Sequence, residues 1–192
     1  MERQRWLDGT LYSPDFEQDS CGFGLIAQID NQPSHTLVQN AIGSLACMTH
    51  RGAIAADGLS GDGCGLLFKK PDAFLRAVAA DAGFTVGDLY AAGLVFLSRD
   101  AAPQAHARST LKSALEAQGL TVAGFRLVPT DSSVCGESAL ESLPHIEQVF
   151  VNAPAGMSED DFERKLYIAR RQAEKALEPA DPVFYLPTLS CR

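Results

Sequence analysis

The sequence contains no apolar run of about 18 residues, the length that a membrane-spanning helix requires. Its first 20 residues also lack the apolar stretch of a secretory signal. Instead they carry five acidic side chains, at Glu2, Asp8, Asp15, Glu17 and Asp19. The sequence therefore predicts a protein without a membrane segment, and the cytoplasm is the expected compartment.

Closely spaced cysteines and an excess of basic residues are absent as well. The five cysteines are odd in number, far apart and without a C-x-x-C pair, so no disulfide framework, zinc site or iron–sulfur site is expected. The formal net charge of −8 disfavours binding to nucleic acid, because phosphate backbones attract basic proteins. A redox or metal protein that uses these cysteines is an alternative that stoichiometric metal in the purified protein would support.

The composition and periodicity are those of a globular domain. A hydrophobic fraction of 46% and a charged fraction of 21% are ordinary for one domain of 192 residues. Helical spacing predicts helices from the N-cap Ser34 to a stop at Gly52, over 71–82, over 102–118, and from Ser158 to Leu177. Strands are predicted over 22–30, 66–68, 91–98, 120–128, 146–152 and 183–189, and residues 130–144 are expected to be irregular. Because strands and helices do not alternate strictly, the pattern favours an α+β (layered α/β) fold.

A glycine-rich segment, DGLSGDGCGLL, begins at Asp57. It lacks the G-x-x-x-x-G-K-[ST] pattern of a phosphate-binding loop and the spaced acidic ligands of a calcium-binding loop. Two interpretations stay open. The segment is a tight turn with a capping aspartate, formed by Asp57, Gly61, Asp62 and Gly63, or it is part of the wall of an active site.

The tripeptide His50-Arg51-Gly52 precedes that segment and also allows two interpretations. Its two basic side chains could cap the end of a helix that stops at the glycine. Alternatively, Arg51 points into a cleft and binds a carboxylate or an oxyanion there.

Cys21 lies where the irregular first 20 residues meet an apolar run, in the sequence DSCGFG. A cysteine at a strand start is ordinarily a packed thiol, whereas a catalytic thiol needs a base and an oxyanion stabiliser. Cleavage between Ser20 and Cys21 would create an α-amino group with a pKa of about 7.7–8.0, which could serve as that base. Residues 1–20 would then keep the amine blocked until their removal.

Three segments, DSCGFGLIAQI, MTHRGAIAADGLSGDGCGLLF and LPHIEQVFVNAP, together resemble a known family. The chain is similar to the class II glutamine amidotransferase domain at the start of the large subunit of bacterial glutamate synthase, an N-terminal-nucleophile hydrolase. The resemblance implies a propeptide at 1–20 and an amidotransferase domain over 21–192. It also implies a four-layer α-β-β-α sandwich, expected to be incomplete at the C-terminus because the family's glutamine-binding arginine segment and Asn-Gly oxyanion pair would follow Arg192.

The resemblance also implies the chemistry. Cys21 would supply both the nucleophilic thiol and the basic amine, and would hydrolyse L-glutamine to glutamate and ammonia. Arg51, with His50 and Gly52, matches the family's His-Arg-Gly motif beside the nucleophile, as a substrate-binding or wall segment. The turn from Asp57 to Gly63 would be an adjacent structural loop.

No cofactor or metal is expected in this chain. In the intact enzyme, ammonia would pass to 2-oxoglutarate on a synthase domain of the same polypeptide, where FMN and an iron–sulfur cluster supply electrons. These electrons would come from NADPH through a small subunit. The alternative function is a truncated, non-catalytic remnant or interaction module of the same fold, which retains its leader and buries Cys21.

Overall fold

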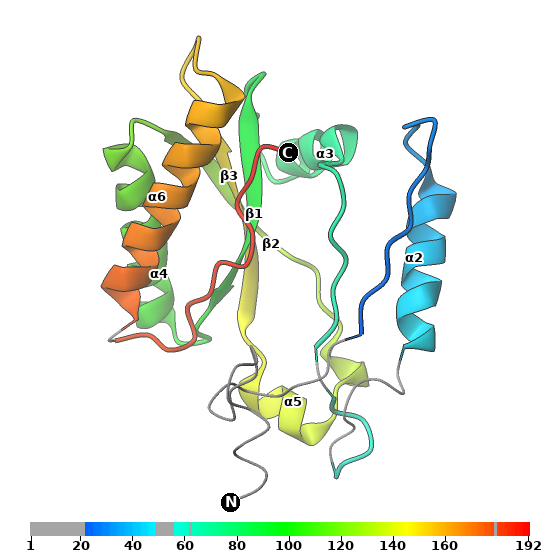
Figure 1. Ribbon diagram of the computed structural model, residues 1–192. Coiled ribbons are helices and arrows are strands. Elements are labelled where there is room, and N and C mark those ends of the chain that lie inside the picture. Colours follow the sequence, from blue (N-terminus) through cyan, green and yellow to red (C-terminus); the bar gives the residue numbers. More distant parts are fainter. Residues whose placement is uncertain (1–21, 49–55, 62, 179) are drawn as a thin grey trace, which may run out of the picture. The chain divides into compact units, whose positions relative to one another are not determined.

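A computed structural model describes residues 22–48, 56–61, 63–178 and 180–192 (Figure 1). The chain divides into two compact units. The first takes in Met1–Leu66 and Cys135–Ala139, and the second takes in Leu67–Val134 and Leu140–Arg192. No helix in the described ranges is long and apolar enough to cross a membrane.

The first unit contains helix α2, His35–Cys47. Ser34 caps it as predicted, because its Oγ accepts a hydrogen bond from the amide of Leu37 at 3.3 Å. The helix ends at Cys47, with Met48 as its C-cap, so it stops before the predicted end at Gly52, a residue outside the described ranges. None of the residues of α2 is fully buried.

The strand predicted over 22–30 is wrong. Residues 22–30 form no strand, and the apolar side chains of Phe23 and Ile29 are 92% and 102% exposed. An apolar run becomes a strand only where a neighbouring strand pairs with it, and the described part of the first unit contains no strand. The strand predicted over 66–68 is wrong too, and Leu67 and Phe68 are exposed.

The second unit is built on a three-stranded antiparallel sheet, in the order β1-β3-β2. Its strands are β1 (Tyr90–Leu97), β2 (Thr121–Leu127) and β3 (His145–Asn152), which confirms three of the predicted strands. The register pairs Tyr90 with Asn152 and Leu97 with His145. A bulge interrupts β2 between Val122 and Gly124.

Helices α4 (Ala101–Ala117) and α6 (Glu159–Leu177) lie side by side on one face of this sheet (Figure 1). Ser158 caps α6 as predicted, because its Oγ accepts from the amide of Asp161 at 3.1 Å. The apolar face predicted for this helix is confirmed, since the five residues predicted to form that face are fully buried: Phe162, Leu166, Ala169, Ala173 and Leu177.

Helix α3, Asp72–Asp81, follows Pro71 and packs on the opposite face of the sheet (Figure 1). It agrees with the predicted helix to within one residue at each end. Leu75 and Val78 of α3 form a second, smaller core with Tyr90 and Phe150 of the sheet. This core leaves part of that sheet face half-buried.

The prediction of irregular structure over 130–144 is wrong in part. The segment contains a 3₁₀ turn, η2 (Ser132–Val134), and the six-residue helix α5 (Glu137–Ser142). A helix this short has too few residues to show a periodic apolar pattern.

The final strand predicted over 183–189 is also wrong. Two isolated bridges, Phe96 with Tyr185 and Ala92 with Ser190, join this segment to the edge of β1. Between them, Pro187 has no amide to donate, which prevents a continuous ladder. Gly93 also allows a close backbone approach there: a Cβ at Gly93 would overlap the carbonyl oxygen of Thr188.

Gly93→Ala is therefore expected to destabilise the second unit. The added Cβ would also lie 3.0 Å from the Cα of Leu189, so the backbone would have to move. We expect the free energy of unfolding to fall by about 2 kcal/mol in urea titrations. Gly87→Ala is the control, because its Cβ would lie an ordinary 3.7 Å from Asn152 Oδ1. Equal losses in the two variants would contradict this account of the edge.

Candidate functional site

The structure describes only part of the predicted site. Asp57, Gly61 and Gly63 lie within the described ranges. The other predicted site residues lie outside them: Cys21, His50, Arg51, Gly52 and Asp62. The described geometry therefore consists of the turn at Asp57 in the first unit and of two polar clusters in the second unit.

Asp57 holds a tight turn together. Its Oδ1 accepts hydrogen bonds from the amides of Leu59, at 3.0 Å, and Ser60, at 2.8 Å. Its Oδ2 accepts from the Ser60 hydroxyl at 2.5 Å. These bonds hold the pKa of the Asp57 carboxyl well below its usual range, and the bond from the Ser60 hydroxyl has the largest effect. Asp57 is thus an ionised acceptor at neutral pH and a poor candidate for a general base.

The same two side chains reach a distant segment of the first unit. Asp57 Oδ2 accepts from the amide of Ser138 at 3.3 Å, and Ser60 Oγ accepts from the amide of Ala139 at 3.1 Å. Ser60 is only 7% exposed. This contact could not be predicted from local sequence pattern, because Ser60 and the 136–139 segment lie about 80 positions apart.

A second polar cluster, which no local sequence pattern predicts, lies in the second unit. Glu147 of β3 is 5% exposed and accepts two hydrogen bonds from the Arg108 guanidinium. The bond from Arg108 Nε is 2.7 Å long. His145 Nε2 lies 2.9 Å from Glu147 Oε1. Burial alone would raise the pKa of Glu147, but the bonds from Arg108 and His145 outweigh it and lower that pKa. With both oxygens engaged, Glu147 stabilises the fold and is not a candidate acid or base.

The lowered pKa predicts how stability depends on pH. The pKa of Glu147 is lower in the folded chain than in the unfolded chain, so its ionisation stabilises the fold. This contribution is present in full at pH values above the unfolded pKa of about 4.3. That contribution is lost as the pH falls through the folded pKa. The stability difference between the wild type and Glu147→Gln should therefore shrink between about pH 6 and pH 3 in urea titrations. A difference that stays constant over this range would contradict the shift.

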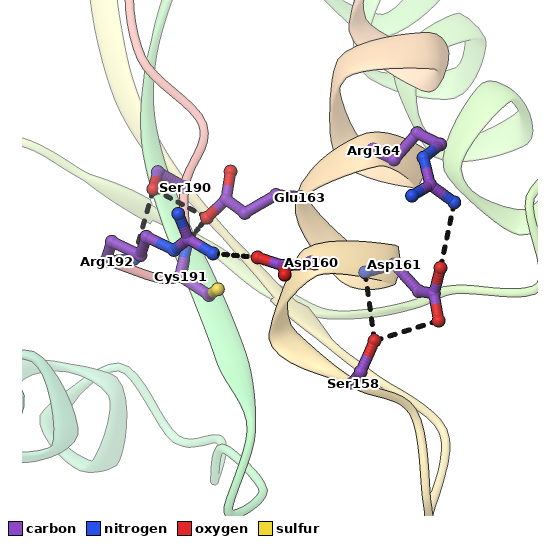
Figure 2. Close-up of polar contacts among 8 residues, drawn as sticks. All are labelled: Ser158, Asp160, Asp161, Glu163, Arg164, Ser190, Cys191 and Arg192. Atoms are coloured by element: carbon purple, nitrogen blue, oxygen red, sulfur yellow. Dashed lines mark hydrogen bonds and ion pairs between the residues drawn. The ribbon is translucent and has the colours of Figure 1, made fainter.

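A third cluster ties residues 190–192 to α6 (Figure 2). Glu163 accepts from the Ser190 hydroxyl and from the amide of Cys191, both at 2.7 Å, and Arg192 pairs with Asp160. Cys191 is 6% exposed, and burial raises the pKa of its thiol to about 12. A thiol that stays protonated is a poor nucleophile, so Cys191 is a packed structural residue.

Comparison with known proteins decides the family. The family model for class-II glutamine amidotransferases matches residues 21–192. This chain belongs to the class-II glutamine amidotransferases. That membership confirms the resemblance drawn from the sequence.

Relatives of this amidotransferase domain are glutamate synthases. It is 39% identical over 178 residues to ferredoxin-dependent glutamate synthase 2 of Synechocystis sp., an alignment that covers 92% of this chain and 11% of the relative. It is 38% identical over 184 residues to the glutamate synthase (NADPH) large chain of Azospirillum brasilense, and 35% identical over 181 residues to that of Bacillus subtilis. Each of these two alignments covers 94% of this chain and 12% of the relative. The chain thus spans about a tenth of the length of these relatives.

Proposed function

We propose that this chain is a glutaminase that hydrolyses L-glutamine to glutamate and ammonia through Cys21, as the amidotransferase part of a glutamate synthase. The observation that carries the proposal is the family match, which begins at Cys21 and runs to residue 192. The start of that match also supports residues 1–20 as a propeptide and 21–192 as the amidotransferase domain.

The proposed reaction begins once the Ser20–Cys21 bond is cut. The free α-amino group of Cys21, with a pKa of about 7.7–8.0, takes the proton of its own thiol. The thiolate attacks the side-chain amide carbon of glutamine, and the amine returns the proton to the leaving ammonia. Water then hydrolyses the γ-glutamyl thioester, which releases glutamate and restores the thiol.

The neighbouring motif has a supporting part in this proposal. Arg51, with His50 and Gly52, forms the substrate-binding wall beside the nucleophile, where a guanidinium can pair with the carboxylate of glutamine. The turn at Asp57 is structural, which is supported by its carboxylate being engaged by backbone and hydroxyl donors.

The proposed architecture is the four-layer α-β-β-α sandwich of N-terminal-nucleophile hydrolases. The second unit supports it with one antiparallel sheet that carries α4 and α6 on one face. The other face carries α3, and α3 does not cover all of it. Three apolar side chains on that face are only half-buried: Leu94, Phe96 and Ile146. We expect a second sheet to cover this apolar strip in the folded domain.

In the intact enzyme the ammonia would pass to 2-oxoglutarate on a synthase domain. FMN and an iron–sulfur cluster would act on that synthase domain. A small NADPH-oxidising subunit would belong to an NADPH-type enzyme, whereas some relatives are named as ferredoxin-dependent.

The test is hydrolysis of L-glutamine by the purified full chain. Glutamate and ammonia should form in equal amounts, and L-asparagine, whose side chain is one methylene shorter, should react poorly. A folded chain that begins at Cys21 and releases no ammonia from glutamine would overturn the proposal in favour of a non-catalytic module.

A further inference from the structure

The short helix α5 is capped by side chains from a distant segment. A helix leaves its first amides without partners inside the helix, and a side chain just before it normally accepts one of them. Here that position is Gly136, which has no side chain. The amide of Ser138 donates to Asp57 Oδ2, and the amide of Ala139 donates to Ser60 Oγ. These acceptors lie 81 and 79 residues earlier in the chain.

The contact leaves no room for a larger residue before the helix. A Cβ at Gly136 would overlap Asp57 Oδ2 and Ser60 Oγ and would lie 2.7 Å from the amide nitrogen of Ser60. Within the described ranges the Asp57 carboxylate accepts four hydrogen bonds, three within its own turn and one from Ser138. A carboxylate has about four acceptor positions, so this one is fully used by the protein.

We propose that this contact positions the active-site wall for glutamine. We call it the Asp57–Ser60 clamp, and it consists of those two side chains with the backbone of residues 136–139. It fixes the turn that follows His50-Arg51-Gly52 along the chain, and it acts through that turn without touching glutamine. The inference rests on the proposed glutaminase function and adds Asp57 and Ser60 to it as positioning residues.

The clamp also engages amides in the first turn of α5. The Ser138 and Ala139 amides donate to Asp57 and Ser60, so they are not available to bind a phosphate or another anion. Because the clamp holds one wall and not the nucleophile, its loss should weaken the binding of glutamine more than the chemical step. A change in KM with little change in kcat is the signature of lost binding that is equal in ground state and transition state.

The test compares Asp57→Asn with Asp131→Asn in the full chain. Asp131 is a matched control, because its carboxylate also accepts from a serine amide and hydroxyl, those of Ser133, at 3.0 and 2.6 Å. Hydrogen exchange of the Ser138 amide should quicken by about tenfold in Asp57→Asn, since its acceptor loses its charge. Exchange of the Ala139 amide should quicken too, because the Ser60 hydroxyl that accepts from it is itself held by Asp57 Oδ2. The KM for glutamine should rise by about tenfold, with kcat within about twofold. Ser60→Ala should shift both values the same way, and Ser60→Thr, which keeps the hydroxyl, should restore them.

The outcomes separate this inference from the proposed function. Unchanged exchange at residues 138 and 139 in Asp57→Asn would overturn the clamp itself. If Asp57→Asn shows faster exchange but has the same KM and kcat as the control Asp131→Asn, the contact is merely structural and the positioning role is overturned. In both cases an active wild type would leave the glutaminase function standing, whereas a wild type without glutaminase activity would overturn the function and, with it, the positioning role.

Discussion

Cys21→Ala is expected to abolish glutamine hydrolysis, with a loss of about 10⁵-fold or more in kcat. The substitution removes the only group proposed to form a covalent bond with the substrate. The α-amino group that remains at position 21 is a base without a thiol to activate, and an uncatalysed attack of water on an amide is very slow. Ammonia release at saturating glutamine measures the effect directly.

Cys47→Ala is the matched control for that experiment. Cys47 is an exposed cysteine at the end of α2, so its loss should leave kcat and KM unchanged. A Cys21→Ala protein that keeps more than about a tenth of the wild-type rate would assign the reaction to another residue. The same assay on Cys21→Ser shows how much of the rate depends on sulfur, since a serine hydroxyl is a far weaker nucleophile at neutral pH.

Arg108→Met is expected to lower the free energy of unfolding by about 3 kcal/mol at pH 7. The guanidinium supplies two of the hydrogen bonds to Glu147, whose side chain faces the core between the sheet and α4. Without Arg108, a buried carboxylate keeps only the contact with His145. Removing one partner of a buried pair is costly because the other charge stays desolvated.

Lys112→Met on the same helix is the control for Arg108→Met. Lys112 lies 3.8 Å from Glu116, and both side chains are more than half exposed, so this pair should contribute less than about 0.5 kcal/mol. Urea unfolding of both variants compares the two pairs in one helix. Similar losses would mean that the Arg108–Glu147 pair contributes no more than a surface pair.

The sequence predicted the second unit well where local pattern and packing agree. In α6, the N-cap Ser158 and five apolar residues at helical spacing specify both the start of the helix and its buried face. The three strands of the sheet follow for the same reason, since each is an apolar run with a neighbouring strand to pair with. The run over 22–30 has an apolar content similar to that of β2 and β3 and yet forms no strand, which shows that composition alone does not make a strand.

The candidate site was less predictable, because its contacts join distant segments. Helix α5 is specified partly by Asp57 and Ser60, about 80 positions away, and no local pattern announces such a cap. The partner of Glu147 is likewise 39 positions distant. The role proposed for Cys21 came from the family resemblance of several motifs together. Its spacing from the other cysteines carried no such signal.

The central claim is that Cys21 becomes the first residue and the nucleophile. One measurement tests it: the intact mass and N-terminal sequence of the purified full chain, before and after treatment with an electrophile that mimics glutamine. We expect a chain that begins at Cys21, lacks residues 1–20 and carries a single adduct on that cysteine. A chain that still begins at Met1 and leaves Cys21 unmodified would contradict the account.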